Sequence, residues 1–188
     1  MLKFIYFISS YYCNYLNHLD AESAKTLVHA FVSSRVEGCN ALLAGSSKAT
    51  TDRLQRVLNA AARVVSETHK FDRGLTHLLH SELHWLDVPQ RIQFNLGVTV
   101  HRCLRDNSPQ YLVDCCKSAT DAVSRQRLRS ASRHQLIVPQ HLRTNFGRRA
   151  FTVAGPTAWN SLPDYLRDPS LSEDTFRRLL KTYLFALY

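Results

Sequence analysis

A block of arginines in the second half of the chain is the strongest chemical signal in this sequence. Residues 122–163 contain seven arginines and neither a lysine nor an acidic residue, so the block carries +7 of the net charge of +9. A guanidinium group binds phosphate oxygens through paired N–H donors, and alternating residues of an extended chain face the same side. We therefore expect phosphate contacts with single-stranded RNA or DNA, with little sequence preference. The expected contact residues are Arg125, Arg127, Arg129, Arg133, Arg143, Arg148 and Arg149, together with Arg53, Arg56 and Arg63 on a predicted helix. The alternative is that this charge run is only a solvated loop.

Three histidines lie close together in the first half of the chain. His80 and His84 have the i, i+4 spacing of a helical zinc pair, and His77 precedes them by one turn. Glu82 does not complete an HExxH motif, and no cysteine is near. We interpret these histidines as solvated or as lying at the edge of a core, and we expect no metal site.

The acidic residues do not form a catalytic set either. Polymerase chemistry needs paired carboxylates that hold two metal ions about 3.5–4 Å apart. Asp20, Asp52, Asp72 and Asp87 are scattered at predicted helix starts and turns, where capping explains them. Phosphate-binding glycine motifs are also missing. We expect no catalytic residue, no cofactor and no small-molecule substrate.

The cysteines and the N-terminal stretch suggest an intracellular protein without a membrane span. The five cysteines form no CxxC pair and no even disulfide framework, which is typical of reduced thiols. For the vicinal Cys115 and Cys116, buried small apolar residues are the favoured interpretation over a strained redox bridge. The apolar run over residues 2–8 is shorter than the roughly 20 residues that cross a bilayer, and no cleavage site follows it. Residues 1–19 are expected to be a stray extension left by truncation.

Apolar residues recur every three or four positions along most of the chain, which predicts helices. Pro89 suits the first position of a strongly apolar helix, and Ser108 with Pro109 suits the start of a short one. Glu173 and Asp174 suit the first turn of a closing helix. The predicted helices cover residues 20–38, 50–66, 71–84, 89–105 and 109–116, and the closing helix begins near Ser172. The expected fold is mainly α, an irregular bundle of about six helices with a loop-rich C-terminal segment.

The loop-rich segment is expected around residues 146–163. Proline has no amide proton and restricts the residue before it, so Gly155-Pro156 should break any regular element. Pro156 then suits the first position of a short helical turn that Pro163 ends. Residues 135–138 are a candidate to pair with residues 150–153 as one small β-ribbon. The side chains expected to anchor the core are Trp85, Phe151, Trp159 and Leu162.

Five stretches, in this order, give the sequence a specific resemblance. They are LVHAFVSSRVEGCNALLAG (27–45), LQRVLNAAARVV (54–65), LHWLDVPQRIQFNL (83–96), RLRSASRHQLIVP (127–139) and RAFTVAGPTAWNSLPDYLR (149–167). Together they resemble the region that follows the polymerase domain in non-LTR retrotransposon reverse transcriptases of the jockey and chicken-repeat kind, over about residues 20–185. In that family the region is a helical, thumb-like tail thought to help grip template and primer.

The resemblance implies a non-catalytic fragment, because the polymerase domain with its aspartates would lie upstream. As an isolated chain it is expected not to be an enzyme. The expected organisation is an extension at 1–19, a helical bundle at 20–116, an arginine- and serine-rich linker at 117–134 and a C-terminal motif with a closing helix at 135–188. The alternative function is a helical protein-interaction scaffold, or an orphan fragment whose partner is the lost or trans-acting polymerase domain.

Overall fold

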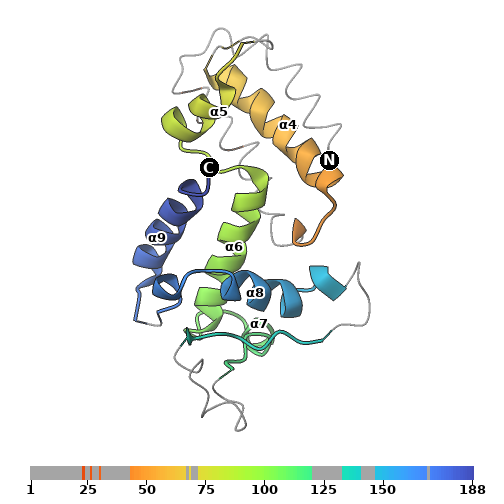
Figure 1. Cartoon of the computed structure of the whole chain (residues 1–188), viewed down its shortest axis with the longest axis vertical. Helices are drawn as coiled ribbons and strands as arrows, with labels where there is room; N and C mark the ends of the chain where they lie inside the picture. Colours follow the sequence, from red (N-terminus) through yellow and green to blue (C-terminus); the bar gives the residue numbers. More distant parts are fainter. Residues whose placement is uncertain are drawn as a thin grey trace. The chain divides into compact units, whose positions relative to one another are not determined.

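The computed structural model describes residues 23, 26, 30, 43–66, 68, 72–119, 133–140, 147–168 and 170–188, apart from the side chains of Val64 and Arg148. The chain divides into two compact units between Pro89 and Gln90, and residues 43–46 belong with the second unit. Throughout the described ranges the regular elements are helices, and the one strand-like feature there is a single antiparallel bridge (Figure 1). The prediction of a mainly α fold is confirmed.

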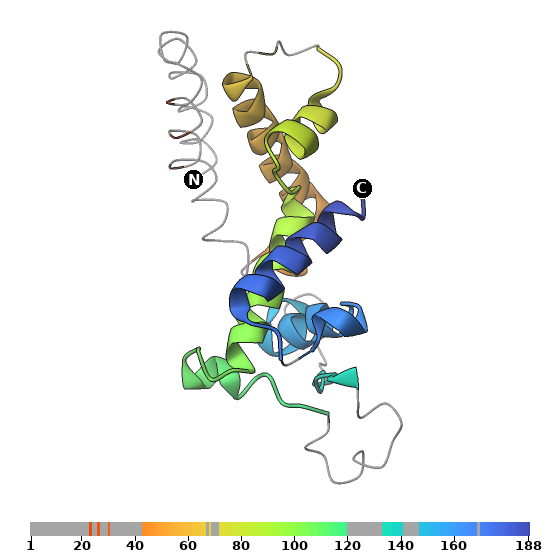
Figure 2. The same ribbon diagram turned by 90° about the vertical axis from the view of Figure 1, so that its left-hand side faces the viewer.

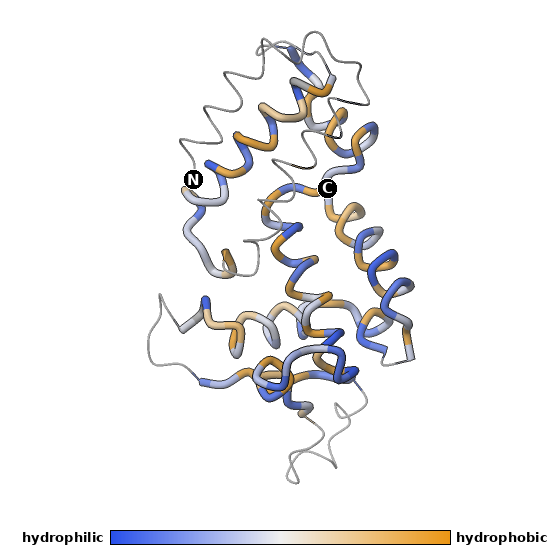
Figure 3. The backbone as a smooth tube through the Cα atoms, turned by 180° about the vertical axis from the view of Figure 1, so that it is seen from behind, coloured by the Kyte–Doolittle hydropathy of each residue, from blue (hydrophilic) through white to orange (hydrophobic). Residues whose placement is uncertain are grey.

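Helix α4 (Lys48–Val65) is the main element of the first unit. It begins after Ser47, whose extended backbone allows the chain to enter the helix. Figure 3 shows hydrophobic and hydrophilic residues alternating along its turns, as an amphipathic helix requires. The buried face comprises Val57, Leu58, Ala61, Ala62 and Val65. This helix agrees with the predicted helix at 50–66.

A short helical segment packs against α4 within the same unit. Helix α5 (Leu75–His77) starts after Gly74, which has a φ of 93°, and continues directly into a π-helical turn, η3 (Leu78–Glu82). Leu78 and Leu79 form a small core with Ala62 of α4. Trp85 packs against this core but is only partly buried, so it lies at the margin of the cluster that it was expected to anchor.

The start of helix α6 (Val88–Cys103) is held by a side chain of α4. Gln55 accepts a hydrogen bond from the backbone N–H of Val88 at 2.8 Å and donates to Asp87 at 2.8 Å. The first N–H groups of a helix have no partner within it, so the Gln55 carbonyl supplies one. Pro89 is the second residue of this helix, where its missing N–H does no harm.

From Gln90 onward α6 is the centre of the second unit. Its buried residues include Ile92, Leu96, Val98 and Val100. Helix α9 (Glu173–Phe185) runs alongside it, and α8 (Phe151–Asn160) crosses it, as Figures 1 and 2 both show. Gly97 packs closely against α9, because a Cβ there would lie 3.0 Å from Leu180 Cδ2. The absence of a side chain at Gly97 thus permits the two helices to pack closely at this position.

The expected break at Gly155-Pro156 was wrong. Helix α8 begins after Ala150 and runs through both residues to Asn160, with Pro156 inside it. Proline removes one backbone hydrogen bond from the helix. The burial of Val153, Ala154, Gly155, Pro156 and Trp159 along this helix offsets that loss. Gly155 packs so tightly that a Cβ would lie 3.2 Å from Val100 Cγ2 of α6.

The expected ribbon between residues 135–138 and 150–153 was also wrong. Residues 151–153 open α8, and Leu136 instead forms the antiparallel bridge with Ser118. A short 3-10 turn, η5 (Gly147–Arg149), precedes α8. After α8 the chain makes a second 3-10 turn, η6 (Asp164–Leu166). The buried Arg167 follows this turn, forms an ion pair with Asp164 and donates a hydrogen bond to the Asn160 carbonyl.

The helices before and after the segment 122–163, α7 (Gln110–Val113) and α9, differ in their N-terminal capping. Helix α9 begins after Ser172 with Glu173 and Asp174 in its first turn, as predicted, and the structure adds that the Ser172 hydroxyl accepts from the Thr175 N–H. Helix α7 begins after Pro109 with no side-chain cap. The predicted cap by Ser108 is wrong, because its hydroxyl bonds to Cys103 instead.

Candidate nucleic-acid interface

The structure places the predicted phosphate contacts in several different settings. Arg125, Arg127, Arg129 and Arg143 lie outside the described residues. Arg148 and Arg149 belong to η5, and the Arg149 side chain is exposed. Arg133 is exposed just before the bridged segment. Arg53 and Arg56 are exposed on α4 in the first unit, and Arg63 there is partly buried.

The α4 arginines share one side of their helix. At about 100° per residue, Arg53, Arg56 and Arg63 fall within roughly 80° of one another, and at 1.5 Å per residue they span about 15 Å. The buried apolar residues of α4 leave these positions outside the core. Arg53 and Arg56 are exposed one turn apart, which suits neighbouring phosphates of one strand, whereas Arg63 is partly buried.

A two-stranded contact brackets the arginine-rich residues in the second unit. The Ala119 N–H donates to the Gln135 carbonyl, and the Ile137 N–H donates to the Lys117 carbonyl, each at 2.9 Å. These two bonds flank the bridged pair Ser118 and Leu136. We call residues 117–119 and 135–137 the ladder. The ladder joins residues 117–119 to residues 135–137, and residues 120–132 lie between these two segments in the sequence.

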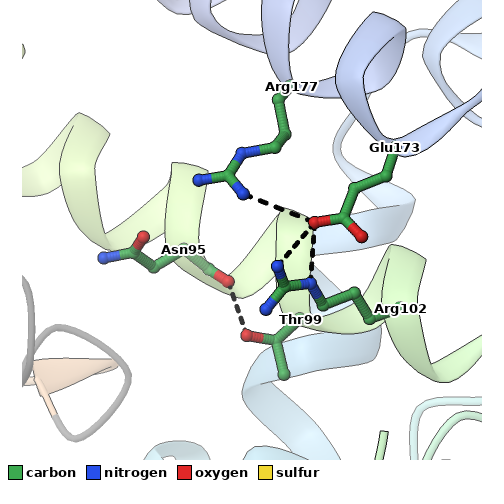
Figure 4. A network of polar contacts seen from close by, with 5 residues as sticks. All are labelled: Asn95, Thr99, Arg102, Glu173 and Arg177. Atoms are coloured by element: carbon green, nitrogen blue, oxygen red, sulfur yellow. Dashed lines mark hydrogen bonds and ion pairs between the residues drawn. The ribbon is translucent and has the colours of Figure 1, made fainter. Parts of the chain in front are cut away.

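A second cationic surface involves residues that were not identified from the sequence. Glu173 Oε1 accepts from Arg102 Nε at 2.8 Å and from Arg177 at 3.4 Å, as Figure 4 shows. The hydrogen bond from Arg102 is the main reason that the pKa of Glu173 is lowered. Two cations share one carboxylate here, so the trio keeps a net positive charge. Only the i, i+4 pair of Glu173 and Arg177 was recognisable from spacing.

His101 lies in the core of the second unit, where α6, α8 and α9 meet. Its ring is 2% exposed and stacks on Phe176 with centroids 4.3 Å apart. Nε2 lies 3.2 Å from the Leu171 carbonyl, so the neutral ring donates there, and Nδ1 is buried without a hydrogen-bond partner. Burial lowers the pKa of His101 below 6.5, although the Leu171 carbonyl acts in the opposite direction. Nothing in the residue pattern singles out this histidine.

Protonation of His101 is expected to destabilise the second unit in mild acid. The unfolded chain binds the proton more readily than the folded one, so stability is present above about pH 6.5 and is lost as pH falls below it. The loss is at most about 1.4 kcal/mol per pH unit. Urea unfolding at pH 7.5 and pH 5 tests this, with His101→Gln as the comparison. If both proteins lose the same stability between the two pH values, another group is responsible.

Two buried thiols meet at the end of α6. Hydrogen bonds from Cys116 and Ser108 to Cys103 lower the pKa of Cys103 to about 7, despite its burial. The same bond, together with burial, raises the pKa of Cys116. Cys115 is partly buried and donates to the Tyr111 carbonyl. Both vicinal cysteines are free thiols; Cys116 is buried as expected, whereas Cys115 is only partly buried.

Neither a metal-binding cluster nor a membrane-spanning helix occurs in the part of the chain that the structure describes. Within those ranges, no three His, Cys, Asp or Glu side chains are grouped so that they could hold a metal ion. His80 lies 3.6 Å from Asp87 within the first unit. None of the described helices has the length and apolar character needed to span a membrane.

Comparison with known proteins adds no relative. No protein-family model, no curated protein and no solved structure matches this chain. Any functional conclusion therefore depends on the residues themselves.

Proposed function

We propose that this chain is the non-catalytic helical region that follows the polymerase domain of a non-LTR retrotransposon reverse transcriptase, and that it binds single-stranded RNA or DNA through arginines. The family assignment is supported by the five ordered stretches of sequence. The binding is supported by one observation above all: residues 122–163 carry seven arginines and no opposing charge. The exposure of Arg133 and Arg149 agrees with this role.

Phosphate contacts have a measurable signature, because each one releases counterions. The logarithm of affinity should fall with the logarithm of salt concentration by roughly 0.7 for each single-strand contact. Five engaged arginines would give a slope near −3.5, at roughly 0.7 per contact. Sequence readout needs base-edge contacts, so oligonucleotides of different sequence should bind alike.

Replacing Arg125, Arg127 and Arg129 together by alanine should flatten that slope by about two units and weaken every oligonucleotide alike. Fluorescence anisotropy with a labelled oligouridylate at several salt concentrations measures both effects. A control removes two exposed cations of α9 that lie outside the Arg102–Glu173–Arg177 trio, as Arg178→Ala and Lys181→Ala, and should change the slope by less than about one unit. Salt-independent binding, or a triple variant equal to the parent, would show that the block is a solvated loop.

The second candidate is a protein-interaction scaffold, with the polymerase domain as its partner. It is favoured by large apolar side chains that the second unit exposes, of which Tyr111 is 69% and Tyr165 is 56% exposed. Exposed apolar surface marks a docking face when it is contiguous. If oligonucleotide binding does not depend on salt concentration, the scaffold becomes the favoured function.

A further inference from the structure

The segment 135–137 is bonded on one edge to residues 117–119, through Gln135 and Ile137, and on the other edge to helix α8, through Leu136. Because Ser118 and Leu136 are the non-hydrogen-bonded pair of the ladder, the N–H and C=O of Leu136 point away from residues 117–119. An uncovered edge of this kind leaves backbone groups without partners. Here the edge is covered by two consecutive side chains of α8.

Asn160 takes the place that a third strand would have. Its Oδ1 accepts from the Leu136 N–H, and its Nδ2 donates to the Leu136 carbonyl, both at 2.9 Å. Trp159 Nε1 donates to the His134 carbonyl at 2.9 Å. His134 has a φ of 48°, a left-handed conformation that residues other than glycine rarely adopt. The two side chains thus hold a constrained backbone segment against a helix of the core.

Cationic side chains lie at both ends of the ladder. Lys117 and Arg133 are exposed there, and both lie in described residues. Asp168 lies near His134: hydrogen bonds from Ser170 lower the pKa of the Asp168 carboxyl, and His134 lowers it further. We therefore assign phosphate contact to Lys117 and Arg133 and not to His134.

We propose that Asn160 is the positioning residue of a phosphate-binding surface, on which the ladder presents Lys117 and Arg133 to the backbone of single-stranded nucleic acid. This inference rests on the proposed function, and it adds the element that holds the cations together. Asn160 does not touch the ligand. It fixes the strand whose end carries Arg133, and the ladder transmits that constraint to Lys117.

The test replaces the amide group of Asn160 by a carboxylate. Asn160→Asp keeps the size of the side chain but sets a carboxylate oxygen against the Leu136 carbonyl, where Nδ2 now donates. The two oxygens repel, and the ladder is expected to detach from α8. Affinity for a labelled oligouridylate should fall about tenfold at low salt, and the salt slope should flatten by about one unit. Amide hydrogen exchange at Ala119 and Ile137 should speed up in parallel.

Asn107→Asp is the matched control, because it makes the same chemical change at an exposed position of the second unit. Its affinity should stay within about threefold of the parent, since exposed charges interact weakly. If Asn160→Asp does not fold, Ala119→Pro serves instead: it removes the N–H that donates to Gln135 and leaves α8 intact.

Two failures are distinguishable. A parent chain that binds no oligonucleotide would refute the proposed function. A parent that binds, with Asn160→Asp or Ala119→Pro binding equally well at the same salt slope, would refute only the positioning role of Asn160. Faster amide exchange with unchanged binding would also refute that role, because the ladder would then be structural alone.

Discussion

Replacing Trp159 by alanine is expected to cost about 3–5 kcal/mol of stability. A small domain has only about 5–15 kcal/mol in total, so this change should bring the second unit close to unfolding. The indole is 1% exposed and packs with ring centroids 5.7 Å from Phe176 and 6.4 Å from His101. Alanine would leave a cavity among these rings and deprive the His134 carbonyl of its donor.

Two variants separate the causes of that loss. Trp159→Phe keeps an aromatic ring but removes the N–H, and should cost less, about 1–3 kcal/mol, mainly through the unpaired His134 carbonyl. Trp85→Ala is the comparison in the first unit, where the indole is only partly buried and a smaller loss is expected. Urea unfolding followed by circular dichroism measures all three. An unchanged free energy of unfolding for Trp159→Ala would show that the Trp159 side chain does not anchor this unit.

Replacing Gly97 by leucine is expected to destabilise the second unit by about 3 kcal/mol, at the upper end of overpacking effects. At this position α6 meets Leu180, Phe176 and Leu162, whose nearest atoms would lie 3.0, 3.8 and 3.9 Å from a Cβ. A larger side chain therefore has no space unless α6 and α9 separate. Alanine should be nearly neutral, because roughly 1 kcal/mol of helix propensity offsets the close approach to the end of the Leu180 side chain.

The quantity to measure is the difference in the free energy of unfolding between Gly97→Leu and Gly97→Ala. Asn95→Leu adds a similar side chain on the same helix at a partly exposed position, and should change stability by less than about 1 kcal/mol. Chemical denaturation of the four proteins gives the comparison. If Gly97→Leu is as stable as the parent, the crossing of α6 and α9 is not as close as the structure shows.

The amphipathic helices are the part of this fold that could be predicted from the residues alone. Helices α4, α6 and α9 follow from apolar residues spaced three or four apart, from Pro89 near a helix start and from Glu173 and Asp174 in a first turn. These signals are local, because a helix bonds each residue to one only four positions away. The lack of acidic residues in the arginine-rich segment 122–163 is also visible in the sequence, so the candidate phosphate contacts could be identified without the structure. Whether they bind nucleic acid stays a prediction, as does the retrotransposon assignment.

Long-range partners became visible only in the folded chain. Gly155-Pro156 carries a strong local signal to break a helix, yet α8 passes through it because burial against α6 outweighs one lost hydrogen bond. The extended pattern of residues 135–138 did not reveal Ser118 as its partner, since any apolar strand of matching length would satisfy it. Asn160 bonds a residue 24 positions away, and His101 finds Leu171 at a separation of 70. Such pairs form only after the helices have packed, because packing brings together groups that local preference cannot select.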